Sequence, residues 1–524
     1  MLFRSLLVLA EQTIRAYGPI PAMGLRHQLG VSPEDAVMLA NAVGAESILV
    51  GDGQTQMFIM PDEIKKMSEF SNVPDDLRIL SLFDPSLASK WAEISARYGD
   101  RWIYPVMRAE RMVGALEIWE MSGCVEIRSM DMDSPDMLED VLKAVDGLMR
   151  FFRMNRKDLV RIREILSTDA AELSDDFVKI LERNGYHFVN GFYAKGNFVP
   201  VTFDEDQIIS YVFRKQHAVR SERYRTVQEA IEDRGYVRTD AELLTRVAEK
   251  TTMKKQAERG LYVMNLVTGY RGYTTERFAS LYRAAKNPVV EGDAKIIEKM
   301  IRERQPISRK ELILASPMSE ERTVELLNGL FHDSVLYMDA KSKYGLIKEV
   351  KADQYGSMKT IVKMSFSEFG IFTAEQMSYL FGLRMAIVRK MLAEFVDEGF
   401  LVQGFFKKDD PTVCWMLKED VHKPIESVTG MLLLNTQDNL HVYFRDMIKR
   451  EFGTENIIFS GTKMIGAFKG KLTASGAKIE DVKGSKEVMR FIRETAAQLG
   501  VRIEEPDDDW DVSEFYLKTN PGTM

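Results

Sequence analysis

The chain has 524 residues, of which 45% are apolar and 29% charged, so it is long enough for several domains and has the composition of an ordinary globular protein. Its two cysteines exclude a disulfide framework and a cysteine zinc site, and its net charge of −8 does not at first favour a nucleic-acid partner. The low cysteine count makes a reducing cytoplasm the expected location, and the first apolar run, SLLVLA, is too short to span a membrane, so we expect no membrane partner.

The first 155 residues begin with helical patterns and continue with strand patterns. YGPIPAMGLRHQLG at 17–30 predicts a short helix that ends at Gly30, and PEDAVMLANAVG and ESILVGDGQTQMFIM predict a further helix and a hairpin. This is the order of a winged helix-turn-helix. ILSLFDPSLASKWAEISARYG at 79–99 then predicts another helix. WIYPVMRAERMVGALEIW at 102–119 alternates apolar and polar residues, which predicts a small β-barrel closed by the helical segment at 137–152.

The same pattern recurs later in the chain, and a third helix-helix-helix-wing pattern spans 293–350. The sequence therefore predicts an α+β fold of tandem winged helix-turn-helix domains with two small β-barrels. We expect one and a half copies of a repeated module, with the front of the first copy missing. The recurring pairs are the segments 17–30 and 369–382 (spacing 352), Asp84 and Asp438 (spacing 354), Gly99 and Gly453 (spacing 354), and MVGA at 112–115 with MIGA at 464–467 (spacing 352).

These patterns divide the chain into eight expected segments. An acidic tail ends it: residues 503–514 hold seven acids and no base, so the other 512 residues sum to −1. We expect this tail to mimic DNA or to solubilise the chain end, and a disordered tail fits equally well. The segments are a winged helix at 1–75, a β-barrel with closing helix at 76–155, a linker or small α/β element at 156–204, a winged-helix-like region at 205–289, winged helices at 290–352 and 353–427, a β-barrel at 428–500 and the acidic tail at 501–524.

Two basic runs stand out in the nearly neutral body. Residues 148–164 hold six bases against two acids, and residues 211–225 hold five against one. Solvated helix faces explain either run alone, whereas two dense runs with interleaved aromatic residues also fit surfaces that follow phosphates. The candidate DNA-binding residues are Arg150, Arg153, Arg156, Lys157, Arg161, Arg214, Lys215, Arg220, Arg223 and Arg225.

LSLFDP at 80–85, followed by MVGAL at 112–116, resembles the motifs of winged-helix DNA glycosylases of the AlkZ/YcaQ type, and Asp438 with MIG at 464–466 does so more faintly. Similar modules form the C-terminal region of Lhr-type helicases. The resemblance implies double-stranded DNA as partner and hydrolysis of the N-glycosidic bond of alkylated or crosslinked bases. It also implies no cofactor, a nucleoid-associated place in the cytoplasm, and a helicase or repair partner. The alternative is a non-catalytic winged-helix DNA-binding protein that acts beside a helicase.

The resemblance extends to 205–219 and 254–284, which are similar to the family's first helix and to the segment that carries its Gln-x-Gln motif. Those glutamines are thought to position the hydrolytic water. This chain has Gln256-Ala257-Glu258, one glutamine short, or Lys254-Lys255-Gln256 if the alignment slides by two residues. Gln256 and Glu258 are the candidate catalytic residues, because a carboxylate can also polarise water and stabilise an oxocarbenium-like centre. A solvated helix face is the competing interpretation. We expect the helix to end at Gly260, with Glu258 in its last turn and directed toward the DNA-facing groove.

Asp84 and Asp438 are further candidate catalytic carboxylates. Asp before Pro or Asn most often caps the helix that follows, and we favour that role. The alternative places both carboxylates at the barrel mouth, facing a damaged nucleotide. The six histidines show no metal-ligand spacing, so no metal is expected.

Overall fold

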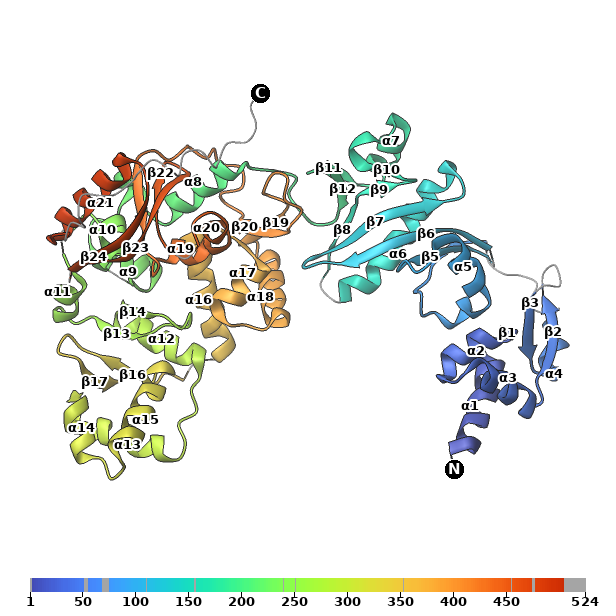
Figure 1. The fold of residues 1–524 in the computed structure, drawn as a ribbon, viewed down its shortest axis with the longest axis horizontal. Helices are drawn as coiled ribbons and strands as arrows, with labels where there is room; N and C mark the ends of the chain where they lie inside the picture. Colours follow the sequence, from blue (N-terminus) through green and yellow to red (C-terminus); the bar gives the residue numbers. More distant parts are fainter. Residues whose placement is uncertain are drawn as a thin grey trace. The chain divides into compact units, whose positions relative to one another are not determined.

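The computed structural model describes residues 2–50, 55–67, 75–109, 111–154, 157–238, 240–249, 251–351, 353–453, 455–473 and 476–503. The chain divides into unit 1 (Met1–Pro200) and unit 2 (Val201–Met524), and each is described by itself. Both units combine helices with sheets, as the α+β prediction requires (Figure 1). Arg156 and the acidic residues after Ile503 lie outside the described residues, so what we predict for them stays a prediction. No helix within the described ranges is long and apolar enough to cross a membrane.

Unit 1 opens with three helices and a hairpin. β3 pairs antiparallel with both β2 and β1, so the short strand between the first two helices completes a three-stranded sheet. Gly30 ends the second helix in the left-handed conformation (φ 65°), and the Ser32 hydroxyl caps the third by accepting a hydrogen bond from the Asp35 amide. Leu25 and Phe58 join the core that these elements share. The elements are α1 (Leu2–Tyr17), β1 (Ile20–Pro21), α2 (Ala22–Leu29), α3 (Pro33–Ala42), β2 (Glu46–Val50) and β3 (Thr55–Ile59).

Unit 2 contains two groups with the same order of elements. In each group the second hairpin strand again pairs with the short strand between the first two helices. Gly382 ends α17 in the left-handed conformation, 352 residues after Gly30 does the same for α2. The first group is α13 (Asp293–Arg304), β15 (Ile307–Ser308), α14 (Arg309–Ala315), α15 (Glu320–His332), β16 (Leu336–Met338) and β17 (Lys343–Leu346). The second is α16 (Gln354–Phe369), β18 (Ile371–Thr373), α17 (Ala374–Phe381), α18 (Met385–Asp397), β19 (Leu401–Gly404) and β20 (Cys414–Leu417).

The rest of unit 1 builds one mixed sheet. β8 lies parallel to β7, a pairing that needs a crossover, and α6 provides it. The apolar face of α6, including Val141, Val145 and Met149, packs against Leu116 and Ile127 of the sheet. The strands are β4 (Leu77–Ile79), β5 (Tyr104–Arg108), β6 (Arg111–Glu120), β7 (Cys124–Met132), β8 (Leu159–Ile162), β9 (Glu164–Ile165), β10 (Thr168–Asp169), β11 (His187–Val189) and β12 (Phe192–Lys195). The helices are α4 (Pro61–Ile64), η2 (Pro85–Lys90), α5 (Trp91–Tyr98), η3 (Pro135–Met137), α6 (Leu138–Met154), η4 (Ala170–Glu172) and α7 (Asp175–Arg183).

Unit 2 ends in a smaller sheet with the order β21-β22-β23-β24. The prediction of small β-barrels is wrong for both units, because among the described residues neither sheet pairs its two end strands. Four strands are too few to close around a core, so a helix covers the apolar face instead. Val488 and Ile492 of that helix pack with Ile458 and Phe468. The elements are β21 (Met431–Leu434), α19 (Asn439–Tyr443), α20 (Arg445–Glu451), β22 (Asn456–Ser460), β23 (Lys463–Thr473), β24 (Gly476–Gly484) and α21 (Lys486–Leu499).

The first part of unit 2 packs around α16. Its helices α8, α9 and α12 contact α16, and its strand β13 pairs with β16. Asp204 and Gln207 form a capping box that starts α8. The elements are α8 (Glu205–Lys215), η5 (Arg220–Glu222), α9 (Val227–Arg234), α10 (Asp240–Arg246), α11 (Met253–Glu258), β13 (Tyr262–Asn265), β14 (Arg271–Thr274) and α12 (Glu276–Lys286).

Gly114 of β6 tests how tightly the sheet of unit 1 is packed. A Cβ at this position would stand 2.2 Å from the Asp131 carbonyl oxygen of β7. Gly114→Ala is therefore expected to destabilise the protein by about 1–3 kcal/mol, because the two strands must separate. The matched control is Gly147→Ala in α6, where a Cβ meets nothing within 4 Å and alanine should stabilise the helix by about 1 kcal/mol. Chemical denaturation measures the free energy of unfolding of both variants. Equal values for Gly114→Ala and Gly147→Ala would contradict the close packing of β6 on β7.

Candidate functional site

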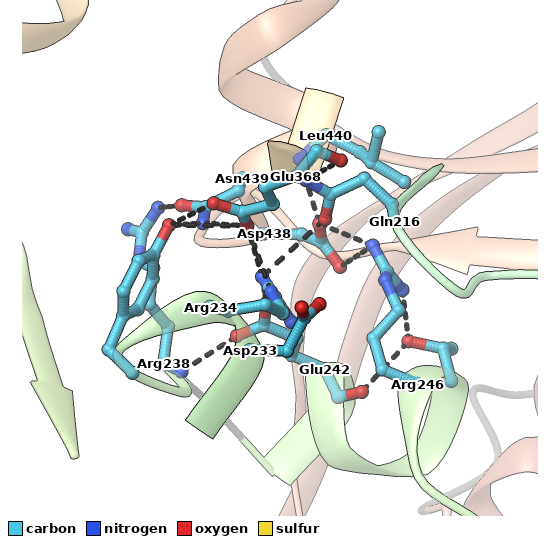
Figure 2. Close-up of polar contacts among 12 residues, drawn as sticks. Gln216, Asp233, Arg234, Arg238, Glu242, Arg246, Glu368, Asp438, Asn439 and Leu440 are labelled. Atoms are coloured by element: carbon cyan, nitrogen blue, oxygen red, sulfur yellow. Dashed lines mark hydrogen bonds and ion pairs between the residues drawn. The ribbon is translucent and has the colours of Figure 1, made fainter. Parts of the chain in front are cut away.

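Unit 2 buries a group of charged side chains where α9, α10, α16 and the start of α19 meet (Figure 2). They come from segments far apart in the sequence. The group therefore crosslinks the first part of unit 2 to α16 and to the C-terminal sheet. We term it the buried charge network, and each member is at most 6% exposed. Its members are Arg234, Arg238, Glu242, Arg246, Glu368 and Asp438.

Arg234 is at the centre of one half of the network. It is the last residue of α9, and Gly235 follows in the left-handed conformation (φ 83°). Arg234 Nε donates to Glu368 Oε1 at 3.0 Å, and Nη2 donates to the same oxygen at 2.5 Å and also to Glu242. The Tyr236 hydroxyl donates to Glu368 Oε2 at 3.2 Å. Arg234 thus pairs with two carboxylates inside the protein, and the formal charges balance over the network as a whole, which has three arginines and three carboxylates.

Arg246 and Asp438 form the other half. Asp438 caps α19: its Oδ1 accepts from the Leu440 amide at 2.8 Å, while Arg246 Nη2 donates to both carboxylate oxygens at 2.8 and 3.0 Å. Asp84 likewise caps η2 by accepting from the Ser86 amide at 2.9 Å. The predicted capping role of both aspartates is confirmed. Their surroundings differ, since Asp438 is buried against Arg246 whereas Asp84 is half-buried and has no ion pair within the described residues.

Burial and neighbouring charges set the ionisation of the network carboxyls. Burial alone would raise the pKa of Glu242, but the charges of Arg234 and Arg246 outweigh it and hold that pKa below its usual value. For Asp438, burial raises the pKa, Arg246 offsets only part of the rise, and the nearby Glu242 adds to it. Glu242 is therefore the firmly ionised carboxylate, and Asp438 is the weaker acid.

Gln256 and Glu258 lie on α11, which ends at Glu258, and Gly260 follows with a φ of 103°. The predicted helix end is confirmed. Gln256 is buried, and its Nε2 donates to Glu249 Oε1 at 3.2 Å and to Thr251 Oγ1 at 3.1 Å. Glu258 is exposed to solvent. The two predicted residues therefore have different surroundings, and the carboxylate beside Gln256 is Glu249.

Backbone pairing joins Gln256 to the network. The Tyr224 amide donates to the Arg246 carbonyl at 2.9 Å, and the Ala248 amide donates to the Tyr224 carbonyl at 2.8 Å. Further on, the Val227 amide donates to Glu249 Oε2 at 3.3 Å. We term residues 217–225 the Arg223 loop. This loop carries Arg220, Arg223 and Arg225, and it packs against the backbone segment 246–249. Arg246 of that segment binds Asp438, and Glu249 binds Gln256. Residues that stand out separately in the sequence are therefore neighbours in the structure.

Four of the predicted DNA-binding residues pair with acids of the same unit. In unit 1, Lys157 pairs with Glu120, and Arg161 Nε donates to Glu126 Oε2 at 2.6 Å. Both bases are at most 4% exposed, so neither reaches the surface as a phosphate contact requires. In unit 2, Arg214 pairs with Glu222 and Glu426, and Lys215 with Asp420.

Five of the remaining predicted bases lie among the described residues, and all five reach the surface. Arg150 and Arg153 are exposed at the end of α6, and Arg220 and Arg225 are exposed in the Arg223 loop. Arg223 is half-buried between the latter two. The basic surface is therefore smaller than the two sequence runs predict, and it is divided between the two units.

A groove of about 820 Å³ opens between α12 and α16. Its lining combines the acids Glu232, Asp233 and Glu276 with apolar side chains such as Leu281 and Met364. None of the predicted site residues lines it. In the part of the chain that the structure describes, no group of three or more His, Cys, Asp or Glu side chains is placed to hold a metal ion.

No family model and no curated protein matches this chain. Among solved structures, the Streptomyces sahachiroi DNA glycosylase AlkZ is similar to it, with 13% sequence identity and a TM-score of 0.43. The match covers 58% of this chain and 100% of that chain. A likeness at this level is a distant relationship of fold and assigns no activity.

The sequence does not predict the network beyond Asp438. Arg234, Glu242 and Glu368 lie in segments that resemble solvated helix faces. The sequence contains one indication of the network: at the repeat spacing of 352, Glu368 of α16 corresponds to Ala16 of α1, so the acid occurs in only one of these two equivalent helices. Glu249 has no such signal, because it precedes the Gln256 helix and belongs to no motif.

Removing one carboxylate of the network should be costly. Glu368→Gln is expected to lower the free energy of unfolding by about 3–5 kcal/mol, because it leaves the three buried arginines of the network with two carboxylates and hence one uncompensated charge. The matched control is Glu375→Gln, at the exposed start of α17, which should change it by less than about 0.5 kcal/mol. Urea denaturation followed by circular dichroism compares the two. Coincident midpoints would show that Glu368 does not stabilise the fold.

Proposed function

We propose that this chain binds duplex DNA through tandem winged helix-turn-helix domains. One observation carries the proposal: the arrangement of three helices and a hairpin occurs in α1–β3, α13–β17 and α16–β20, each time with the same strand pairing. That arrangement is the winged form of a motif that places a helix in the DNA major groove. The resemblance of segments 80–85 and 112–116 to winged-helix DNA glycosylases supports the same partner. In this proposal the protein works at the nucleoid in the cytoplasm, beside a helicase or repair partner.

We further infer one and a half copies of a module, with its rear half in unit 1 and a full copy in unit 2. The matching helix ends at Gly30 and Gly382, and the matching caps at Asp84 and Asp438, support this reading. The different surroundings of the two aspartates then have a reason. Only the complete copy contains α9 and α10, which supply Arg234 and Arg246 of the network.

Base excision is the second candidate function, and Gln256 is the residue that favours it. Glu249 and Thr251 hold its amide nitrogen, which leaves the carbonyl oxygen to accept a hydrogen bond from water. Hydrolysis of an N-glycosidic bond needs such an acceptor, with negative charge near the oxocarbenium-like sugar. Glu249 provides a carboxylate at 3.2 Å from the Gln256 amide nitrogen. The missing second glutamine favours the non-catalytic DNA-binding alternative.

DNA binding is tested by its salt dependence. The Arg220→Ala/Arg225→Ala variant should flatten the log-log salt slope of duplex affinity by about 1.8, because each neutralised phosphate contributes about 0.9. The matched control is Arg214→Ala/Lys215→Ala, whose charges are already paired with Glu222, Glu426 and Asp420, so its slope should change little. Fluorescence anisotropy with a random-sequence duplex gives both slopes. A wild-type slope near zero would remove DNA as the partner.

Base excision is tested by incubating the protein with alkylated duplex DNA and cleaving abasic sites with alkali. Gln256→Ala should lower the excision rate about 10²–10⁴-fold and leave DNA affinity unchanged, because it removes only the group that positions water. Glu249→Gln removes the adjacent negative charge and should also slow excision. Glu258→Gln restores the family's pair of glutamines and should keep or raise the rate. If the wild type releases no base, DNA binding remains and the catalytic candidate fails.

A further inference from the structure

Arg220, Arg223 and Arg246 bring three positive charges together in unit 2. Burial lowers the pKa of the Arg223 guanidinium, and the neighbouring charges of Arg246 and Arg220 lower it further. Asp438 forms an ion pair with Arg246, and Glu222, the acid within the Arg223 loop, forms its ion pair with Arg214. Within the described ranges, the side chains of Arg220 and Arg223 have neither an ion pair nor a hydrogen bond. Two of the three positive charges are therefore unbalanced.

Two of these guanidinium groups also have unused donors. The Nε atoms of Arg223 and Arg246 are buried and lack a hydrogen-bond partner. Arg246 is fully buried, and its other nitrogens donate to Thr245 and Asp438. Folded proteins rarely leave buried donors without an acceptor. The cluster thus lacks an acceptor as well as a negative charge.

The backbone that carries Arg223 is held in place without any ligand. His217 stacks on Tyr224 with ring centroids 3.9 Å apart, and its Nδ1 lies 2.5 Å from the Glu222 carbonyl oxygen. The Ala218 amide donates to the Phe213 carbonyl at 2.9 Å, and Tyr224 pairs with the segment around Val247. Both ends of the Arg223 loop are therefore fixed. The backbone of the loop is therefore held although the arginine charges that it carries repel one another.

We propose that Arg220, Arg223 and Arg246 form a binding site for a phosphate group. A phosphate supplies both of the missing features, negative charge and several strong acceptors, and guanidinium groups match its geometry. Arg220 is exposed and Arg223 is half-buried, so both are accessible to a phosphate from solvent. The identification of a DNA backbone phosphate as the ligand rests on the proposed function. A free phosphate or a small phosphorylated molecule has the same chemistry.

The first experiment measures the melting temperature of the full chain with inorganic phosphate and with chloride at equal ionic strength. Phosphate should raise the wild-type value by about 2 °C or more, and Arg223→Met should abolish the rise. In chloride, Arg223→Met should melt at or above the wild-type temperature, because it removes an unmatched donor and a charge repulsion. If Arg223 only stabilised the fold, Arg223→Met would melt below the wild-type temperature in chloride. The control Arg490→Met, which removes an exposed charge from α21, should keep the full phosphate effect. An equal phosphate effect in Arg223→Met and wild type would overturn the site.

The second experiment identifies the source of the phosphate. If DNA supplies it, Arg223→Met should flatten the log-log salt slope of duplex binding by about 0.9, whereas Arg490→Met should not. An unchanged slope, together with the loss of the phosphate effect, would assign the site to a free phosphate or a small phosphorylated ligand and exclude the DNA backbone. If the wild type does not bind DNA but is stabilised by phosphate, the proposed function fails and the phosphate site stands.

Discussion

The guanidinium of Arg234 is shared by Glu242 and Glu368 inside unit 2, where none of the three side chains is more than 2% exposed. Removing such charges from water is expensive, and only closely matched partners recover the cost. Glu242 is eight residues from Arg234, but Glu368 is 134 residues away. The network can form only when α9 has docked on α16. The placement of the first part of unit 2, and with it the Arg223 loop and Gln256, depends on this match.

The two equivalent helices α1 and α16 show what a covering layer changes. Leu9 of α1 is 49% exposed, whereas Ile361, 352 residues further on, is 4% exposed beneath the first part of unit 2. Ala16 stands where α16 has Glu368. An acid at that position is useful only where a buried arginine faces it, because an unpaired charge would be costly to bury. The two helices share their local architecture and differ where one of them has an internal partner.

Local features of the fold were predictable from the sequence because they depend on residues close together in the chain. Asp84 and Asp438 cap helices through amides two residues away, and Gly30 and Gly382 end helices where only a left-handed residue fits. Features that depend on distant residues were not predictable. A barrel and an open sheet have the same alternating pattern, and only the pairing of the first strand with the last distinguishes them. Closure of the sheets was therefore predicted wrongly.

The predicted DNA-binding role of several charged residues is not supported for the same reason. Arg161 belongs to a basic run, yet its partner Glu126 is 35 residues away, and a local count of charges does not include it. The candidate site was predicted in part: Gln256, Asp438 and Arg223 were singled out from unrelated patterns. The residues that connect them, Arg246 and Glu249, belong to no motif and are recognised only from the contacts they make.

The spacing of the network partners also bears on how the chain is made. A ribosome adds about 5–20 residues per second, so Arg234 is synthesised roughly 7–27 s before Glu368. Arg246 precedes Asp438 by 192 residues, or roughly 10–38 s. During that interval the arginines of α9 and α10 have no carboxylate from the later segments and should stay hydrated. Docking of the first part of unit 2 is therefore a late event. It can begin once α16 has left the ribosome and can be completed only after α19 has followed.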